Sequence, residues 1–353
     1  MNLRRGITTG TCAAAAAKAA ASVLVGGNPP PEVELRLPSG ATIRVPVLYA
    51  EREANPAAAT AAVRKDAGDD PDVTHGLEVR VRLSWDDEAN ATFVAGEGVG
   101  TVTKPGLQVP PGQPAINPVP RQMILAAVRE ITARGVRVEI SLPGGREIAA
   151  KTFNPRLGIE GGLSVLGTTG VVRPYCTRAL QDALKCTLDV AAACGVTAPV
   201  LVPGNIGARA ARRHFSLREE QVIEAGNEWG FVLDLLSQHA FRAVMLLGHP
   251  GKLAKLAAGQ WDTHSARSGS VAHDLSQIGP EFLGYPLPDS TTAEGVFAAL
   301  PRSEQTTLAV ELARRVRAAA AGRIGQRLPV AVFLVNMAGD CLGSDGDLAP
   351  WPT

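Results

Sequence analysis

The residues best suited to chemistry in this chain lie in one short turn, Gly248-His249-Pro250-Gly251-Lys252. An apolar run, residues 243–247, precedes the turn and a short helical pattern follows it, so the turn is predicted to join a strand to a helix. An anion bound there would meet the charge of Lys252 and the free N–H groups of a helix start. A second histidine, His264, follows in Thr263-His264-Ser265. The alternative interpretation is a tight structural turn with an exposed lysine.

A second group of polar residues opens the chain, where residues 4–12 (RRGITTGTC) run into a nearly pure alanine segment, 13–21. Alanine favours a helix and presents almost no side chain, so a ligand or another element could approach closely. The hydroxyls and charges at this helix start favour a receptor for a carboxylate or a phosphate. The residues concerned are Arg4, Arg5, Thr8, Thr9 and Thr11. A structural helix capped by Thr11 explains the same pattern equally well. Cys12 is interpreted as a small packed residue.

Two more loops carry charge. Thr101–Gly106 combines threonine and glycine with Lys104, which suits either close approach to a ligand or a hairpin with a bulge. Residues 66–72 contain four aspartates, which lack the order of a calcium loop and are interpreted as a solvated acidic loop. His75, His214, His239 and His273 show no partner pattern, so no metal site is predicted.

The first part of the chain is predicted to be an α+β domain, residues 1–153. Residues 33–37 and 42–47 alternate around a Pro-Ser-Gly turn and predict a hairpin, and residues 77–84 predict a half-buried strand. Residues 120–134 are amphipathic and predict a helix. Residues 55–65 are predicted to be helical, and residues 136–142 and 147–152 are predicted to pair as strands.

Residues 154–353 are predicted to form an open, mostly parallel, doubly wound α/β domain. Apolar strands at 199–202, 221–224, 243–247 and 330–335 alternate with helices at 178–193, 208–214, 231–240 and 304–321. Residues 263–280 are predicted to be a flexible excursion. Loops beginning at Gly167, Gly204 and Gly248 are each predicted to follow a strand, and ligands bind at that edge of such sheets. The three loops are therefore expected to line one crevice.

Composition narrows the function classes. A net charge of +1 gives no overall electrostatic attraction for nucleic acid or an anionic membrane. An aromatic content of 4% argues against a surface that stacks on nucleic-acid bases. The five cysteines form no zinc or redox pair, which fits a reduced, cytoplasmic setting. Neither a signal peptide nor a membrane-spanning segment is expected, and a homodimer is expected on base rates alone.

Taken together, several blocks resemble one family, the cobalt-precorrin-5B C1-methyltransferases of the anaerobic cobalamin pathway. The blocks, in family order, are residues 4–20, 70–76, 98–121, 151–170, 248–259 and 263–265. The resemblance implies a transfer of a methyl group from S-adenosylmethionine to C1 of cobalt-precorrin-5B, a corrinoid, giving cobalt-precorrin-6A. The substrate is a flat macrocycle edged with carboxylates, which suits distributed arginine and lysine side chains.

The resemblance also suggests roles for particular residues. The 1–153 domain is expected to face the corrinoid, through Arg4, Arg5, Thr8, Thr9, Thr11, Lys104 and Arg121. The 154–353 domain is expected to hold the methyl donor, through Gly167, Thr168, Thr169, Gly170, Gly204, Asn205, Gly248 and Lys252. His249 or His264 is expected to accept or relay a proton. The alternatives are a non-catalytic corrinoid-binding protein, and another enzyme acting on an anionic substrate.

Overall fold

The chain forms two compact units, Met1–Thr177 and Arg178–Thr353. The structure is a computed structural model that describes residues 3–54, 57–87, 91–288 and 290–353. The predicted boundary after residue 153 is wrong, because two later strands pair within unit 1. Ile159–Glu160 (β10) pairs with Thr101–Val102 (β8), and Val171–Val172 (β11) pairs with Gly6–Ile7 (β1).

Unit 1 is an α+β unit, as expected, and a five-stranded sheet in the order β4-β5-β6-β9-β7 forms its centre. The pairs are antiparallel except β7 with β9. The predicted hairpin is confirmed as a separate antiparallel pair, β2 with β3. The remaining elements of the unit are α1 (Thr9–Leu24), β2 (Glu32–Arg36), β3 (Thr42–Pro46), β4 (Tyr49–Glu53), β5 (Ala58–Arg64), β6 (Glu78–Trp85), β7 (Thr92–Ala95), α2 (Pro118–Arg129), β9 (Val136–Ser141) and α3 (Gly145–Ala149).

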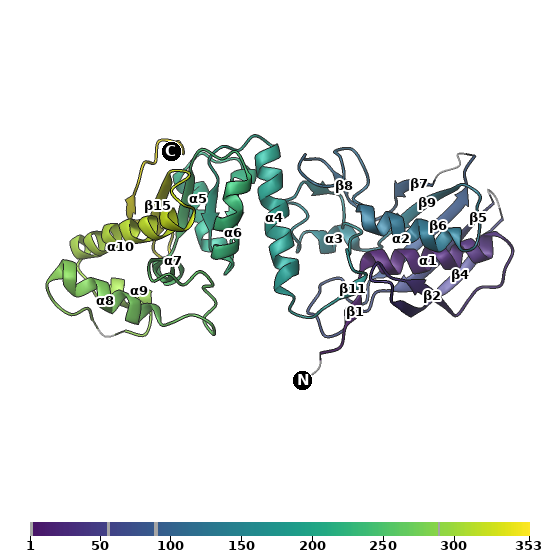
Figure 1. Cartoon of the computed structure of the whole chain (residues 1–353), viewed down its shortest axis with the longest axis horizontal. Helices are drawn as coiled ribbons and strands as arrows, with labels where there is room; N and C mark the ends of the chain where they lie inside the picture. The colour runs from purple at the N-terminus through teal and green to yellow at the C-terminus, as the bar shows by residue number, and fades with distance from the viewer. Residues whose placement is uncertain (1–2, 55–56, 88–90, 289) are drawn as a thin grey trace. The chain divides into compact units, whose positions relative to one another are not determined.

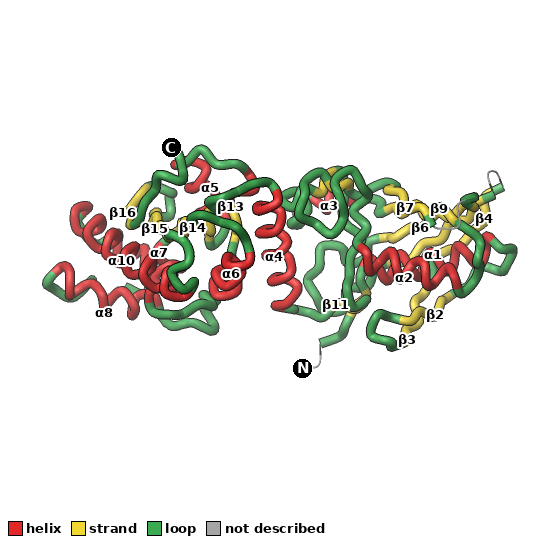
Figure 2. The backbone as a smooth tube through the Cα atoms, turned by 45° about the horizontal axis from the view of Figure 1, so that its top comes forward, coloured by secondary structure: helices red, strands yellow, loops and turns green. Residues whose placement is uncertain are grey.

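The alanine helix α1 lies in the core of unit 1. Its alanines from Ala13 to Ala21 are fully buried, and it packs against α2, β5 and β6 (Figures 1 and 2). The facing strand β5 is itself rich in alanine, so small side chains on both elements allow the helix to lie against the sheet. The alanines therefore serve internal packing. Burial also raises the pKa of Cys12 to about 12, which agrees with its interpretation as a packed residue.

Two predicted elements of unit 1 are wrong. Residues 58–64 form strand β5 instead of a helix, because pairing with β4 on one side and β6 on the other outweighs the helix preference of its alanines. The start of that predicted helix, residues 55–56, lies outside the described residues. Residues 147–152 do not pair with β9, since Gly144 adopts a left-handed conformation and begins the short helix α3. Strand β9 pairs with β6 and β7 instead.

Unit 2 is built on a second five-stranded sheet, in the order β13-β12-β14-β15-β16. Its first four strands are parallel, as predicted, and the antiparallel strand β16 at the edge was not predicted. Residues 271–283 form a helix where an excursion was expected. The elements are α4 (Thr177–Ala193), β12 (Val200–Val202), α5 (Asn205–His214), β13 (Val222–Glu224), α6 (Trp229–Leu235), β14 (Val244–Gly248), α7 (Pro250–Ala257), α8 (Val271–Leu283), α9 (Ala293–Ala298), α10 (Arg302–Arg323), β15 (Val330–Val335) and β16 (Cys341–Asp345), with short 3-10 turns at Glu219–Gln221 and Leu236–Gln238.

The helices of unit 2 cover both faces of its sheet. Side chains of α5 share a core with Val200, Val202 and Met245. Side chains of α4, α6, α7 and α10 share the other core with Leu201 and Leu246. The predicted doubly wound α/β architecture is thereby confirmed. Within the described residues, no helix is both long enough and apolar enough to cross a lipid bilayer.

Candidate functional site

The start of α1 is a capped and buried helix end. Thr8 is the N-cap, and its Oγ1 accepts a hydrogen bond from the Thr11 N–H at 3.2 Å. Thr11 Oγ1 donates to the Gly170 carbonyl at 2.7 Å, and Thr9 Oγ1 accepts from the Leu166 N–H at 3.0 Å. These three side chains are at most 7% exposed. The structure thus contradicts the predicted anion receptor at this helix start, because the hydroxyls bind the chain itself, and the N-cap is Thr8 instead of Thr11.

The predicted donor loop Gly167–Gly170 belongs to this same arrangement. A Cβ on Gly167 would lie 2.3 Å from Thr8 Oγ1, and one on Gly170 would lie 3.0 Å from Thr11 Oγ1. The loop packs on the start of α1 in unit 1 and follows no strand of the parallel sheet. The expectation that it shares a sheet edge with the loops at Gly204 and Gly248 is therefore wrong.

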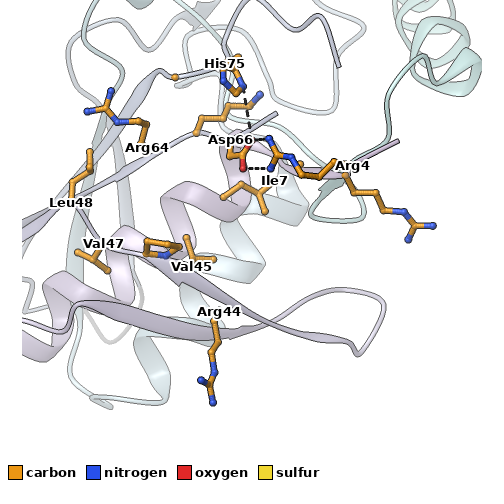
Figure 3. A pocket seen from close by; sticks show the side chains of 14 residues that line it. Arg4, Ile7, Arg44, Val45, Val47, Leu48, Arg64, Asp66 and His75 are labelled. Atoms are coloured by element: carbon orange, nitrogen blue, oxygen red, sulfur yellow. Dashed lines mark hydrogen bonds and ion pairs between the residues drawn. The ribbon is translucent and has the colours of Figure 1, made fainter. Parts of the chain in front are cut away.

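The adjacent residues Arg4–Ile7 do contribute to a surface pocket, with a volume of about 520 Å³. Its apolar lining comes from Ile7 and from the segment Val45–Leu48. Figure 3 shows Arg44 and Arg64 at different ends of this lining, with Val45, Val47 and Leu48 between them. We call this feature the basic pocket. Its lining residues are Arg4, Arg5, Gly6, Ile7, Arg44, Val45, Pro46, Val47, Leu48, Arg64, Lys65, Asp66, His75 and Gly76.

The charge of the basic pocket is only partly neutralised. Arg4 makes a two-pronged ion pair with Asp66, with Nη2 donating to Oδ1 at 2.9 Å (Figure 3). The hydrogen bonds from Arg4 and from the Gly68 N–H lower the pKa of Asp66 to about 2. Asp66 therefore stays ionised and holds Arg4 in place. Arg64 is exposed, and Arg44 is 72% exposed and makes only long contacts, of 3.5 and 4.0 Å, with Glu32 and Glu34.

Behind the pocket, the acidic segment is an ordered support instead of the expected solvated loop. Lys65, with its side chain 2% exposed, donates to Asp72 at 2.6 Å. Thr74 Oγ1 also donates to Asp72, at 2.6 Å. Burial by itself raises the pKa of Asp72, but the hydrogen bonds from Lys65 and Thr74 outweigh it, and the pKa is lowered overall. His75 Nδ1 accepts from the Ala67 N–H at 3.1 Å, which fixes the ring at the edge of the pocket.

Besides the three threonines of the α1 start, two more predicted substrate residues, Lys104 and Arg121, lie outside the lining of the basic pocket. Arg121 is half-buried, donates from Nε to the Ile116 carbonyl at 2.8 Å, and stacks over the Phe93 ring at 5.1 Å. Burial lowers its pKa. The aliphatic stem of Lys104 packs on Gly158, where a Cβ would approach within 2.4 Å. The loop of Lys104 follows β8, which pairs with β10. The loop also closes on itself as the hairpin interpretation expects, because the Val102 N–H donates to the Gln113 carbonyl at 3.0 Å and the Gly112 N–H donates to the Val102 carbonyl at 2.7 Å.

In unit 2, the order in which the chain adds strands to the sheet reverses direction between β12 and β14, and we call this position the switch point. From β12 the chain passes through α5 to β13 on one side, and it then returns through α6 to β14 on the other side. The helices that follow β12 and β14 cover opposite faces. Such a switch point is where ligands bind in open α/β sheets. The loops at Gly204–Asn205 and Gly248–His249 flank it, as the sequence predicts.

His249 caps the helix at this switch point. Its Nδ1 accepts from the Gly251 N–H at 3.0 Å, and its Nε2 lies 2.7 Å from Glu294 Oε2. Because the Gly251 N–H can only donate, Nδ1 carries no proton, and Nε2 donates to Glu294. Both ring nitrogens are thus engaged, which favours a capping role over the predicted proton relay. His264 is exposed, and its Nδ1 accepts from the Ala266 N–H at 3.2 Å.

Lys252 lies in the first turn of α7 and reaches toward residues of two other segments. Its Nζ donates to Asn227 Oδ1 and, at 3.4 Å, to the Thr263 carbonyl. The neighbouring Lys255, 5% exposed, donates to the same carbonyl at 3.3 Å. Burial, together with the charge of Lys255, lowers the pKa of Lys252. This arrangement brings the predicted residue Lys252 beside the block Thr263–Ser265.

Sequence reasoning missed several residues that the structure places at these sites. They are Arg44, Arg64, Lys65, Asp66 and His75 in unit 1, and Asn227 and Lys255 in unit 2. A signal was available for His75, which lies within the block of residues 70–76 that carried the family resemblance. Asn227 lies three residues after the end of a predicted strand, 221–224. Among the residues that the structure describes, no three His, Cys, Asp or Glu side chains gather closely enough to hold a metal ion.

A pocket lined by cations in one unit and a doubly wound sheet with glycine-rich loops in the other are typical of enzymes that bind small anionic molecules. Comparison with known proteins identifies the family. The CbiD family model matches residues 1–174, which is nearly all of unit 1. The chain belongs to the CbiD family of cobalt-precorrin-5B C(1)-methyltransferases.

Individual relatives extend the similarity over both units. The chain is 53% identical over 349 residues to the cobalt-precorrin-5B C(1)-methyltransferase of Syntrophotalea carbinolica, which covers 99% of each chain. It is 42% identical to the corresponding protein of Moorella thermoacetica, over 97% of this chain and 95% of that one. A crystal structure of a cobalamin biosynthesis protein from Archaeoglobus fulgidus is 31% identical, covers 75% of this chain and 83% of that chain, and superposes with a TM-score of 0.40.

Proposed function

We propose that this chain transfers a methyl group from S-adenosylmethionine to C1 of cobalt-precorrin-5B, giving cobalt-precorrin-6A in cobalamin biosynthesis. The observation that carries the proposal is the basic pocket of unit 1, in the part of the chain that the family model matches. Its chemistry corresponds to that of the acceptor, and the full-length relatives are named for this reaction.

The fit of the basic pocket rests on two kinds of contact. A corrinoid precursor is a broad apolar ring edged with acetate and propionate groups. The side chains of Ile7, Val45 and Leu48 offer apolar contacts to a ring face. Arg5, Arg44 and Arg64 are exposed and can form two-pronged hydrogen bonds with carboxylates. The net charge of the chain is only +1, so a polyanionic substrate depends on such a local group of cations.

We place the methyl donor at the switch point of unit 2, with Gly204, Asn205, Gly248 and Lys252 as its contacts. Two properties of the Gly204–Asn205 loop support this. A Cβ on Gly204 would meet no atom within 4 Å, so backbone there is open to a ligand. The first turn of α5 has no side-chain cap, which leaves N–H groups for a polar ligand. When bound, S-adenosylmethionine supplies an electrophilic methyl group on a sulfonium.

The residues of the chain have three tasks in such a reaction. They must bind the two ligands, align the methyl group with C1, and exclude water, and none of these requires a nucleophilic side chain. A proton released as the ring rearranges needs an acceptor, and His264 is the better candidate of the two predicted histidines because its ring is exposed. The cytoplasmic location and the homodimer stay predictions.

A pair of substitutions separates capping from proton transfer at His249. Asparagine is a good N-cap, whereas alanine is not, so His249→Ala is expected to lower the free energy of unfolding by about 1 kcal/mol and His249→Asn by much less. If His249 only caps α7, His249→Asn keeps turnover within a few-fold of the wild type. Equal loss of turnover in both variants, with the stability of His249→Asn intact, would instead assign the proton relay to His249. Urea denaturation and single-turnover methyl transfer provide the two measurements.

The proposed function is tested with purified protein, labelled S-adenosylmethionine and cobalt-precorrin-5B. We expect label to appear in the corrinoid, at C1. Arg44→Gln and Arg64→Gln should each weaken corrinoid binding about tenfold, because a charge-assisted hydrogen bond contributes roughly 1.5 kcal/mol or more. Arg137→Gln, on an exposed position of β9 outside the pocket, is the matched control and should bind normally. Tight corrinoid binding without any methyl transfer would reject the enzyme and favour a carrier.

A further inference from the structure

Two lysines of α7 hold their ammonium groups around a single carbonyl oxygen. Lys252 Nζ lies 3.4 Å and Lys255 Nζ lies 3.3 Å from the Thr263 carbonyl oxygen. Lys255 is 5% exposed and Thr263 is fully buried. Lys252 also donates to Asn227 Oδ1, and Lys255 also donates to Ser268 Oγ at 2.5 Å. Among the described residues, every hydrogen-bond partner of these two cations is therefore a neutral oxygen.

In the described part of the chain neither ammonium group forms an ion pair, since no carboxylate oxygen lies within 4.0 Å of either Nζ, and Asp262 and Asp274 act on the two charges only from farther away. Both carboxylates have nearer partners than the two lysines. Asp262 pairs with Arg267 at 3.0 Å, and Asp274 lies beside the Gln260 amide at 3.4 Å. Buried charges in proteins are normally paired, because burial without a counter-charge is costly. The consequence is visible at Lys252, whose pKa is lowered by burial and by Lys255 more than the distant charge of Asp262 raises it.

The neutral partners form a fixed support. The Thr263 N–H donates to the Asn227 carbonyl at 3.2 Å, and Thr263 Oγ1 donates to Asn227 Oδ1 at 3.2 Å. Asn227 follows β13 and Lys252 follows β14, so the pair lies at the carboxyl edge of the sheet. The cations are thus held at the edge where ligands bind in this class of sheet, and they are not on a freely moving surface loop.

We propose that Lys252 and Lys255 form a subsite for a carboxylate of a bound ligand. A carboxylate would supply the missing negative charge and would accept hydrogen bonds from both ammonium groups. The inference rests on the proposed function, which provides two sources of this group: the amino-acid end of the methyl donor and a side chain of the corrinoid. Lys255, which the sequence did not single out, becomes a binding residue with Lys252.

Calorimetric titration tests the subsite without depending on turnover. The probes are S-adenosylhomocysteine, which has the amino-acid carboxylate, and 5′-methylthioadenosine, which lacks it. If the donor supplies the carboxylate, Lys252→Met and Lys255→Met each weaken S-adenosylhomocysteine at least tenfold and leave 5′-methylthioadenosine unchanged. If the corrinoid supplies it, the same variants instead weaken cobyrinic acid and not its amidated form. Lys185→Met is the control, because Lys185 already pairs with Asp189 at 2.7 Å.

The outcomes separate the inference from the proposed function. Wild-type protein that binds S-adenosylhomocysteine and cobyrinic acid, with both lysine variants binding them equally well, overturns the subsite and leaves the proposed function standing. Wild-type protein that binds neither probe overturns the proposed function, and the subsite with it. Circular dichroism spectra and melting temperatures of the variants check that each is folded. Because methionine has a similar length and no charge to bury, we expect both variants to fold.

Discussion

Replacing Gly6 with alanine is expected to detach the first strand of unit 1 and to abolish ligand binding in the basic pocket. A Cβ on Gly6 would lie 2.2 Å from the Ala67 carbonyl carbon and 2.5 Å from its Cα. These are backbone atoms of the segment that bears Asp66, so no rotation of a side chain can relieve the clash. The clash would separate Arg4, Arg5 and Ile7 from the rest of the pocket lining.

Gly6→Ala is expected to change two measurable properties, the stability of the protein and its affinity for the corrinoid. Overpacking of this kind lowers the free energy of unfolding by about 1–3 kcal/mol, which urea denaturation followed by circular dichroism would record. Corrinoid binding, followed by absorbance titration, should fall by at least a hundredfold, because apolar and charged contacts are lost together. Gly322→Ala is the control, since a Cβ there meets nothing within 4 Å and alanine favours the helix α10. A Gly6→Ala protein with unchanged stability and affinity would contradict this account.

Local patterns located the elements whose burial has a clear period. The alternation of Val79, Val81 and Leu83 identified strand β6, and the helical spacing of Met123, Ile124 and Ala127 identified α2. In unit 2, the predicted strands at 199–202, 243–247 and 330–335 are apolar at every position, which is typical of a parallel sheet covered on both faces. Strand β5 was missed because its alanines suit a helix equally well, and only pairing with β4 and β6 decides the matter.

The candidate sites were harder to predict because their partners are far apart in sequence. The hydroxyls of Thr9 and Thr11 were visible, but their acceptors and donors lie at Leu166 and Gly170. The basic pocket needs an N-terminal strand, a hairpin, the end of β5 and His75, which only tertiary pairing brings together. Lys252 was found because its own turn carries the signal. Lys255 was not, since burial of a lysine is invisible in the sequence.

Removing Asp72 is expected to destabilise unit 1 more than any surface substitution. The Lys65 side chain is 2% exposed and its ammonium group donates to Asp72 at 2.6 Å. Asp72→Asn leaves a buried cation without a counter-charge, which lowers the free energy of unfolding by about 3–5 kcal/mol in comparable pairs. The double variant Lys65→Met/Asp72→Asn should recover at least about 1 kcal/mol, because no unpaired charge is then buried. Lys185→Met, which breaks an ion pair on a half-exposed lysine, should change stability by less than about 1 kcal/mol.

The same pair predicts a dependence on pH. Because folding lowers the pKa of Asp72, the stabilisation is complete above the ordinary aspartate pKa of about 3.9 and is lost as pH falls through the lowered value. The difference in unfolding free energy between the wild type and Asp72→Asn should therefore be constant from about pH 5 to pH 7 and should shrink below about pH 4. Urea denaturation at a series of pH values measures it. A difference that stays the same down to pH 2.5 would show that the charge of Asp72 does not stabilise the pair, and that Asp72 acts only through its hydrogen bonds with Thr74.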